Sequence, residues 1–202
     1  MIQSWMGTGG PGGSLFTVAE GIRAVSPSAV VMVGIAFGLY PKRQQIGDIL
    51  ISQQLLGYDL QRVGTSFDGK PRIYARGDRV SASVRLVDRF RAGKLKSNFQ
   101  DWLKPPRIEF GLVFSGSMLI DNLDVRDQLH AIASEAIGGE MEGAGLYDAA
   151  HRYKVDWILV KAICDWADGK KHFKKEERQK LAAENAARFV IQVIQQGGFV
   201  ST

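Results

Sequence analysis

Acidic side chains form two clusters in the last third of this 202-residue chain. Glu140 and Glu142 belong to the first cluster, and Asp165 and Asp168 follow the apolar run Trp157–Ile163. An ionised carboxylate only accepts hydrogen bonds and has two oxygens in one plane, so Glu142 could accept both hydrogens of a vicinal diol such as that of ribose. Burial disfavours the charged form of a carboxylic acid, so Asp165 could keep a proton and donate it to a leaving group. Such a pair suits a site that holds a sugar and protonates the group attached to it, as in cleavage of an N-glycosidic bond.

Each acidic cluster also has a purely structural interpretation. Glu140 and Glu142 can be solvated carboxylates at the start of a helix, where the helix dipole favours negative charge. Asp165 and Asp168 can instead cap the element that follows them. On these residues alone both interpretations stay open.

The segments around the two clusters predict an α/β fold. We expect a short helix directly after Glu142, a buried strand at 157–163 and a long closing helix over 175–196. Further helices are predicted from near residue 14, over 84–91 and over 122–132, and further strands over 29–33, 49–52, 58–63 and 108–114. The alternation of helices and strands predicts a mostly parallel sheet with helices on both faces. The length predicts one domain over residues 1–202.

The opening segment MGTGGPGGS, residues 6–14, carries five glycines and one proline. Its amides can approach a ligand closely, and it leads into the first predicted helix, so Gly7, Gly9 and Gly10 could cradle a phosphate or a ribose. A tight turn or a flexible chain start explains the same residues equally well. The segment has no Gly-Lys-Ser/Thr end, so it is not a Walker loop.

Composition is that of an ordinary globular protein, with 45% hydrophobic and 23% charged residues. The net charge of +5 fits a basic surface, a phosphorylated substrate or nucleic acid, and the first is the simplest interpretation. The densest basic cluster, residues 170–180, has Lys and Glu at helical spacing and is interpreted as the first turns of an exposed helix.

Several features bear on the compartment and on metals. The one cysteine, Cys164, cannot form an internal disulfide, and no apolar run approaches the roughly 18 residues of a membrane span. The start has neither the basic region nor the apolar core of a signal peptide. We therefore expect a cytoplasmic protein. No spacing of His, Cys or carboxylates suggests a metal site.

Three motifs in order resemble a known superfamily. EMEG (Glu140–Gly143) followed by KAICDWAD (Lys161–Asp168) looks like the signature of the nucleoside phosphorylase and nucleosidase superfamily, which includes the methylthioadenosine/S-adenosylhomocysteine nucleosidases. VVMVGIAFGLYPKRQQIGDILIS (Val30–Ser52) and FSGSMLIDN (Phe114–Asn122) resemble two further segments of this superfamily. The resemblance runs from Met6 to about Gln196. It implies a three-layer α/β/α fold with a central mixed, mostly parallel sheet.

The resemblance also implies roles for individual residues. Met141 and Glu142 would hold the ribose, and Asp165 would protonate N7 of the purine. Leu119 and Ile120 would contact the base. Further implied substrate contacts are Glu140, the turn residues Gly34, Ile35 and Ala36, and Gly7, Gly9 and Gly10 around whatever extends from the 5′ position. No cofactor is implied.

Departures from the superfamily pattern lead to further expectations. The chain enters the pattern at about the third or fourth strand, as an N-terminally truncated copy would, so we expect an unpaired sheet edge. Ile35 stands where phosphorylases use a Ser or Thr to bind phosphate, which favours hydrolysis. Cys164 and Lys161 replace a usual Ser and Arg, so the hydrogen-bonding neighbours of Asp165 are expected to differ.

The leading hypothesis is a purine nucleoside or nucleotide N-glycosidase that releases adenine. The combination of GGPGGS, EMEG and ICDWADG looks like the branch often attached to bacterial defence proteins, so the substrate would be methylthioadenosine- or S-adenosylhomocysteine-like, or AMP or ATP. One alternative is a phosphorylase that uses phosphate, and another is a catalytically inactive nucleotide-binding sensor. The expected partners are a small purine compound and further copies of the chain, with no nucleic acid and no membrane.

Overall fold

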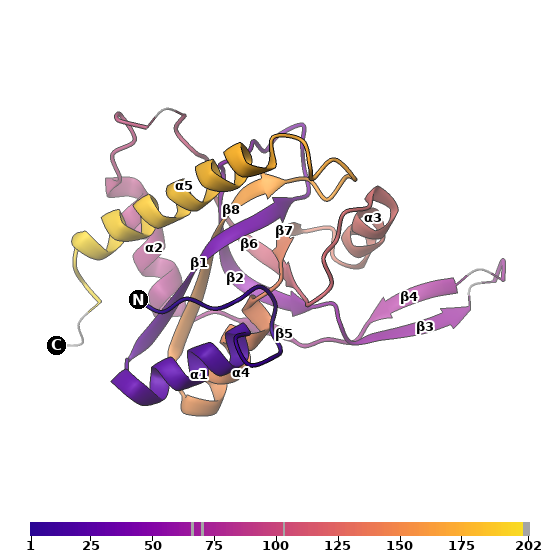
Figure 1. The fold of residues 1–202 in the computed structure, drawn as a ribbon, viewed down its shortest axis with the longest axis horizontal. Coiled ribbons are helices and arrows are strands. Elements are labelled where there is room, and N and C mark those ends of the chain that lie inside the picture. Colours follow the sequence, from indigo (N-terminus) through magenta and orange to yellow (C-terminus); the bar gives the residue numbers. More distant parts are fainter. Residues whose placement is uncertain (66, 70, 103, 200–202) are drawn as a thin grey trace.

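The computed structural model describes residues 1–65, 67–69, 71–102 and 104–199. Six strands form one sheet in the order β5-β2-β6-β7-β1-β8, with helices on both sides (Figure 1). The strands of this sheet are β1 (Ala29–Gly38), β2 (Ile49–Gly57), β5 (Arg79–Ser81), β6 (Ile108–Ser115), β7 (Ala136–Glu140) and β8 (Asp156–Asp165). The helices are α1 (Ser14–Val25), α2 (Val84–Lys96), α3 (Leu123–Ile132), α4 (Gly143–Tyr153) and α5 (Lys175–Gln195).

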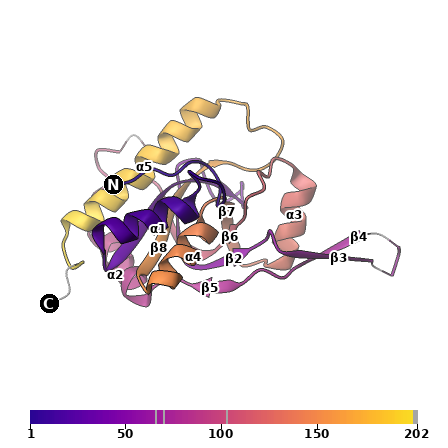
Figure 2. The same cartoon turned by 60° about the horizontal axis from the view of Figure 1, so that its bottom comes forward.

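A separate two-stranded hairpin projects from the body of the molecule. It consists of β3 (Gln61–Thr65) and β4 (Pro71–Ala75), which pair antiparallel. The hairpin extends away from the sheet in both views of the ribbon (Figures 1 and 2). None of the described helices combines the length and the apolar character that crossing a membrane requires.

The sheet is mixed and curls back on itself. The pairs β1–β8, β2–β6 and β6–β7 are parallel, whereas β1–β7 and β2–β5 are antiparallel. Residues Ile49–Ile51 of β2 also pair antiparallel with Val160–Ala162 of β8, so five strands form a partly closed barrel. The ladders shift register in three places, and such bulges increase local bending and twist. At one of them the Ser52 hydroxyl accepts a hydrogen bond from the Leu159 amide.

One row of paired residues crosses the sheet where the site lies. Phe37 of β1 pairs with Asp165 of β8 on one side and with Gly139 of β7 on the other, and Gly139 pairs in turn with Phe114 of β6. A side chain at Gly139 would collide with the Phe37 ring. This register places the end of β8 one strand away from the end of β7, although the two ends are far apart in the sequence.

Four of the helices pack as two pairs on opposite sides of the sheet (Figures 1 and 2). In the first pair, α1 lies close to α4 because Gly145 leaves room for Ser14 and Leu15. In the second pair, α2 contacts α5 through Phe90 and Phe189, whose ring centroids are 5.9 Å apart. Burying the apolar faces of these helices against the sheet supplies the main favourable term in folding.

β1 has an unpaired edge. Its pairing with β7 covers only Phe37 and Gly38, and no described strand lies on that side of residues 29–36. The side chain of Val33 is 39% exposed, and a groove of about 590 Å³ runs between residues 30–33 and residues 1–4. The expected unpaired sheet edge is confirmed.

The predicted α/β fold, with helices on both sides of a mixed sheet, is confirmed, and the predicted elements differ mainly at their ends. Gly34, Ile35 and Ala36, expected to form a turn, continue β1, and β7 was not among the predicted strands. The strand expected at 49–52 runs on to Gly57, and the strand expected at 58–63 is replaced by β3, which begins at Gln61. Pairing with neighbouring strands extends β1 and β2 beyond their predicted ends, whereas β3 begins later than predicted.

Phe90 gives a test of the packing between α2 and α5. Its side chain is fully buried, so Phe90→Ala should lower the free energy of unfolding by about 3–5 kcal/mol. Leu95→Ala, at an 87% exposed position of the same helix, should change it by about 0.5 kcal/mol or less. Urea denaturation followed by circular dichroism measures both, and equal effects of the two variants would contradict this packing.

Candidate active site

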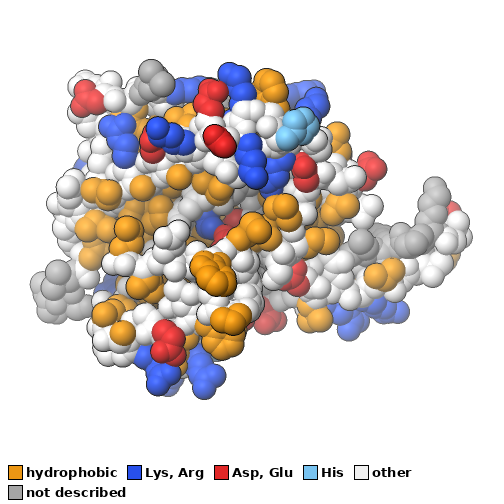
Figure 3. Space-filling model, viewed as in Figure 1, with side chains coloured by type: hydrophobic (Ala, Val, Ile, Leu, Met, Phe, Trp, Pro, Cys, Tyr) orange, Lys and Arg blue, Asp and Glu red, His pale blue; other side chains and the backbone are white. Residues whose placement is uncertain are grey.

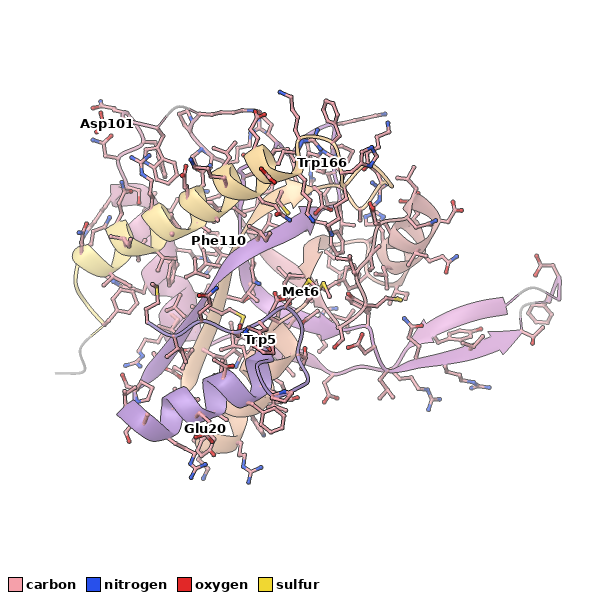
Figure 4. All side chains as sticks on the ribbon, in the orientation of Figure 1. Trp5, Met6, Glu20, Asp101, Phe110 and Trp166 are labelled. Carbon is pink, nitrogen blue, oxygen red and sulfur yellow. The ribbon has the colours of Figure 1, made fainter. Side chains whose placement is uncertain are left out.

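A pocket of about 360 Å³ opens where β1, β7 and β8 end. In the space-filling view this face is hollowed, with acidic and basic side chains in the floor and apolar side chains around it (Figure 3). Met6 comes from the N-terminal segment and Trp166 follows β8, and Figure 4 shows both near this part of the sheet. The lining residues are Met6, Ile35, Ala36, Phe37, Met118, Leu119, Ile120, Gly139, Glu140, Met141, Glu142, Cys164, Asp165, Lys171, Lys175 and Gln179.

Glu140 fixes the junction between β7 and α4. Its buried carboxylate accepts hydrogen bonds from the amides of Glu142 and Gly143, at 2.9 Å each. Amides at the start of a helix have no hydrogen-bond partner within the helix, and the helix dipole also favours a negative charge there. A Cβ at Gly143 would crowd the Glu140 carboxylate, which explains a glycine at this position. The helix-start interpretation therefore holds for Glu140, but the carboxylate is buried rather than solvated.

Lys161 joins β8 to this junction. Its ammonium lies 2.6 Å from Glu142 Oε2 and 3.2 Å from Glu140 Oε2, and its side chain is only 4% exposed. Burial alone would lower the pKa of Lys161, but the two carboxylates outweigh burial and raise it. Lys161 is therefore a buried ammonium shared by two carboxylates.

Each carboxylate oxygen of Glu142 accepts a hydrogen bond from a different partner. Oε1 accepts a hydrogen bond from the Gly7 amide at 2.9 Å, and Oε2 accepts one from Lys161. Burial raises the pKa of Glu142, but Lys161 and the hydrogen bonds outweigh burial, so the pKa lies below its ordinary value. The Thr8 hydroxyl also donates to the Met141 carbonyl at 3.2 Å. The glycine-rich segment is thus attached directly to the EMEG motif.

Asp165 lies at the other end of the pocket floor. Its Oδ1 accepts a hydrogen bond from the Ala167 amide at 2.9 Å, an Asx-type turn that matches the capping interpretation. Its Oδ2 accepts one from Cys164 Sγ at 3.2 Å and lies 3.5 Å from Lys171 Nζ. Burial raises the pKa of the Cys164 thiol, so Cys164 stays protonated and acts as a donor.

A loop after β6 supplies apolar side chains to the wall. Leu119 and Ile120 line the pocket from this loop. The Tyr58 hydroxyl lies 2.7 Å from the Met118 carbonyl, and both oxygens of Asp59 accept from the Ser117 amide. These bonds fix the loop that carries the two apolar side chains.

The structure brings most of the predicted site residues together in this pocket. Eight of them line it: Ile35, Ala36, Leu119, Ile120, Glu140, Met141, Glu142 and Asp165. Gly7 contacts Glu142 from outside the lining, and Gly34 lies beside the Lys161 side chain. Gly9 and Gly10 are not among the lining residues, and their contact with substrate stays a prediction.

Other residues of the pocket had no predicted role. Lys161 was expected to affect the neighbours of Asp165, but it contacts the two glutamates instead. Its signal was a lysine within an apolar strand, where a buried charge needs a partner. Lys161 lies behind the lining, whereas Met6, Lys171, Lys175 and Gln179 line the pocket itself, and the sequence placed the three polar ones in an exposed segment. Among the described residues, no group of three or more His, Cys, Asp or Glu side chains could hold a metal ion.

Comparison with known proteins identifies the family of the chain. A family model described as the phosphorylase superfamily matches residues 6–195. The chain belongs to the phosphorylase superfamily.

Similar members of the superfamily are nucleosidases. The chain is 30% identical over 181 residues to a death domain-containing ATP nucleosidase from Amphimedon queenslandica, a match that covers 82% of this chain and 33% of that protein. It is 25% identical over 173 residues to a 5′-methylthioadenosine/S-adenosylhomocysteine nucleosidase from Haemophilus influenzae, which covers 86% of this chain and 72% of the relative. The chain thus spans about a third of the first relative and under three quarters of the second.

A solved superfamily structure has the same fold. The 5′-methylthioadenosine/S-adenosylhomocysteine nucleosidase from Neisseria meningitidis, in complex with methylthio-immucillin-A, superimposes with a TM-score of 0.77 at 23% identity. The match covers 96% of this chain and 79% of that structure.

In this superfamily member, Lys161→Met tests whether the buried ammonium holds the site together. The change leaves two buried carboxylates without their cation, so the free energy of unfolding at neutral pH should fall by about 3–5 kcal/mol. The deficit should shrink at acid pH. In the native protein the pKa of Glu142 lies below its ordinary value of 4.5. The ionised carboxylate therefore stabilises the fold fully above pH 4.5, and this stabilisation is lost as the pH falls through the pKa of Glu142 in the folded protein. In the variant this contribution is absent, so the two proteins converge as Glu142 becomes protonated.

Urea denaturation between about pH 3.5 and 7 measures this difference. Lys180→Met is the matched control. Lys180 is exposed, and its ion pair with Glu184 is long, at 4.0 Å, and lies on the surface, so the loss of this ammonium should have little effect at any pH. A deficit for Lys161→Met that stays the same from pH 7 to pH 3.5 would show that the ammonium does not act through these carboxylates.

Proposed function

We propose that this protein is an N-glycosidase that hydrolyses a purine nucleoside or nucleotide and releases adenine. Water attacks C1′ of the ribose, the bond between C1′ and N9 breaks, and its electron pair passes to the base. Asp165 gives a proton to N7 of the leaving adenine, and the proton lost by the attacking water replaces it through solvent. The products are adenine and the free sugar derivative.

The observation that carries this proposal is that Asp165 and Glu142 line the same pocket. A general acid must come within hydrogen-bond reach of the atom that it protonates, while the sugar is held in place. Asp165 and Glu142 come from the ends of different elements and meet only because β7 and β8 both flank β1. Two acids that only ended their own helices or strands would not need to share a cavity.

Glu142 is suited to hold a diol. A carboxylate has about four lone-pair positions, and the described residues use one on each oxygen, through Gly7 and Lys161. One position on each oxygen remains for the 2′ and 3′ hydroxyls of ribose. The lowered pKa keeps Glu142 ionised and therefore able to accept both bonds. Both oxygens of Glu140, in contrast, already contact the first amides of α4 or the Lys161 ammonium, so we propose that Glu140 positions Glu142.

Asp165 is suited to lose a proton during the reaction. Cys164 Sγ and Lys171 both face Oδ2, and both interact more strongly with a carboxylate than with a carboxylic acid. They therefore stabilise the charge that appears on Asp165 as the base departs. Leu119 and Ile120 offer the apolar surface that a purine ring requires.

Hydrolysis is favoured over phosphorolysis. Ile35 lines the pocket and cannot donate a hydrogen bond to phosphate. The named relatives are nucleosidases, whose reaction uses water. The candidate substrates remain methylthioadenosine- and S-adenosylhomocysteine-like compounds, AMP and ATP. We further propose that residues 1–202 act as one domain, in a homo-oligomer, in the cytoplasm.

Asp165→Asn tests the proposed acid. An amide cannot transfer a proton to N7, so adenine release should fall by about 10²–10⁴-fold while binding of adenosine is kept. Chromatographic detection of free adenine measures the first, and titration calorimetry the second. Asp168→Asn is the matched control. Asp168 does not line the pocket, and among the described residues its one hydrogen bond is accepted from the Lys170 amide, so the variant should keep native activity.

The same assay separates the rival functions. Adenine release that requires added phosphate would identify a phosphorylase, and binding of adenosine or ATP with no release by the native protein would identify a sensor. Full activity of Asp165→Asn would remove Asp165 from the mechanism.

A further inference from the structure

All but one of the charged side chains that line the pocket contact a side chain that can carry the opposite charge. Glu140 and Glu142 share Lys161, and Asp165 lies 3.5 Å from Lys171. Lys175 also lines the pocket, but none of the described carboxylates forms an ion pair with it. The pocket wall therefore includes an ammonium, on the exposed residue Lys175, that forms no ion pair with the described carboxylates.

Lys175 lies at the start of α5, on the helix face that forms part of the pocket wall. Lys175 is the first residue of α5, and Gln179 follows one helical turn later on the same face. Both side chains line the pocket, together with Lys171 from the segment before the helix. The positive end of the α5 dipole lies at the same place and adds to the attraction for an anion.

The acids next to Lys175 in the sequence lie outside the pocket. Glu176 and Glu177 lie in the first turn of α5, but neither lines the pocket. Glu177 is 3.4 Å from Lys174, which takes up part of its charge. The pocket side of this turn thus presents Lys175 and the amide of Gln179.

The pocket is large enough for a nucleoside but too small for a long 5′ substituent as well. A volume of about 360 Å³ is near the lower end for ligand sites, enough for a base and a sugar but not for a long substituent. With the 2′ and 3′ hydroxyls on Glu142, a 5′ substituent too long for this volume would have to leave the pocket past its exposed lining residues. The rim includes Lys175 and the 70% exposed Met6.

We propose that Lys175, assisted by Lys171 and Gln179, binds an anionic group on the 5′ substituent, namely a phosphate. The inference rests on the proposed function and names its substrate class: adenine nucleotides rather than uncharged nucleosides. An ammonium binds phosphate oxygens through charge-assisted hydrogen bonds, which are among the stronger ones in proteins. The net charge of +5 also favours the encounter with a polyanion.

Turnover of a substrate series tests this assignment. The kcat/KM of the native protein is measured for adenosine, methylthioadenosine, S-adenosylhomocysteine, AMP and ATP, with free adenine as the readout. The two nucleotides should be preferred. S-adenosylhomocysteine carries a carboxylate beside an ammonium, so a preference for it alone would assign the anion to a carboxylate and overturn the phosphate assignment.

Lys175→Ala should lower the ratio of kcat/KM for ATP to that for adenosine by about tenfold, the value of one charge-assisted hydrogen bond. Lys180→Ala removes the same charge from an exposed position of α5 outside the pocket and should leave this ratio and the activity unchanged. An unchanged ratio in Lys175→Ala, or an equal fall in Lys180→Ala, would overturn the proposed subsite.

A binding measurement keeps the two proposals apart. In the Asp165→Asn background, titration calorimetry should show tighter binding of ATP than of adenosine, and Lys175→Ala should remove most of this difference. The difference should also shrink when the salt concentration is raised, because the contact is ionic. Equal binding of ATP and adenosine would overturn the inference while leaving adenine release intact. A native protein that releases adenine from no compound would instead overturn the proposed function.

Discussion

The site depends on one buried ammonium. Lys161 on β8 contacts both glutamates of the EMEG motif, and neither carboxylate has another described cation within ion-pair distance. A pair of carboxylates buried without a counterion would be costly, because the interior solvates charge poorly and like charges repel. The ammonium therefore permits both acids to stay ionised and ordered, and it fixes β8 against the corner where β7 ends and α4 begins.

Two further contacts extend this constraint. Glu140 bonds the first amides of α4, and Glu142 bonds the Gly7 amide, so the N-terminal segment and α4 are held by the same pair of acids. The Ser14 hydroxyl also donates to the Glu142 carbonyl at the start of α1. A substitution at Lys161 would therefore disturb both helices as well as the pocket.

Local signals in the sequence were sufficient for much of the fold and the site. Asn122 caps α3, and its side chain accepts from the amides of Asp124 and Val125, which is a local preference of the residue type. The placement of Asp165 at the end of an apolar strand is local as well. The extents of β1 and β7 were not predictable in this way, because their glycines gain a strand conformation only from neighbouring strands. Gly139, for example, is required by the Phe37 ring, which comes from a distant part of the chain. The roles of Lys161 and Lys175 likewise depend on packing. Lys161 meets both glutamates because of where β7 ends and α4 begins, and Lys175 lines the pocket because of where α5 begins.

The closure of the sheet has a consequence for how the protein forms. Residues 49–51 of β2 pair with residues 160–162 of β8, so the ladder joins segments separated by most of the chain. Contacts of such long range require a large loss of chain entropy before they stabilise anything, which slows folding. During synthesis, β8 leaves the ribosome only after every other strand, and it brings both Lys161 and Asp165 with it. The strand that completes the barrel also brings Asp165 of the pocket and the ammonium that holds its two glutamates, so a nascent chain has no assembled pocket until its last strand is in place.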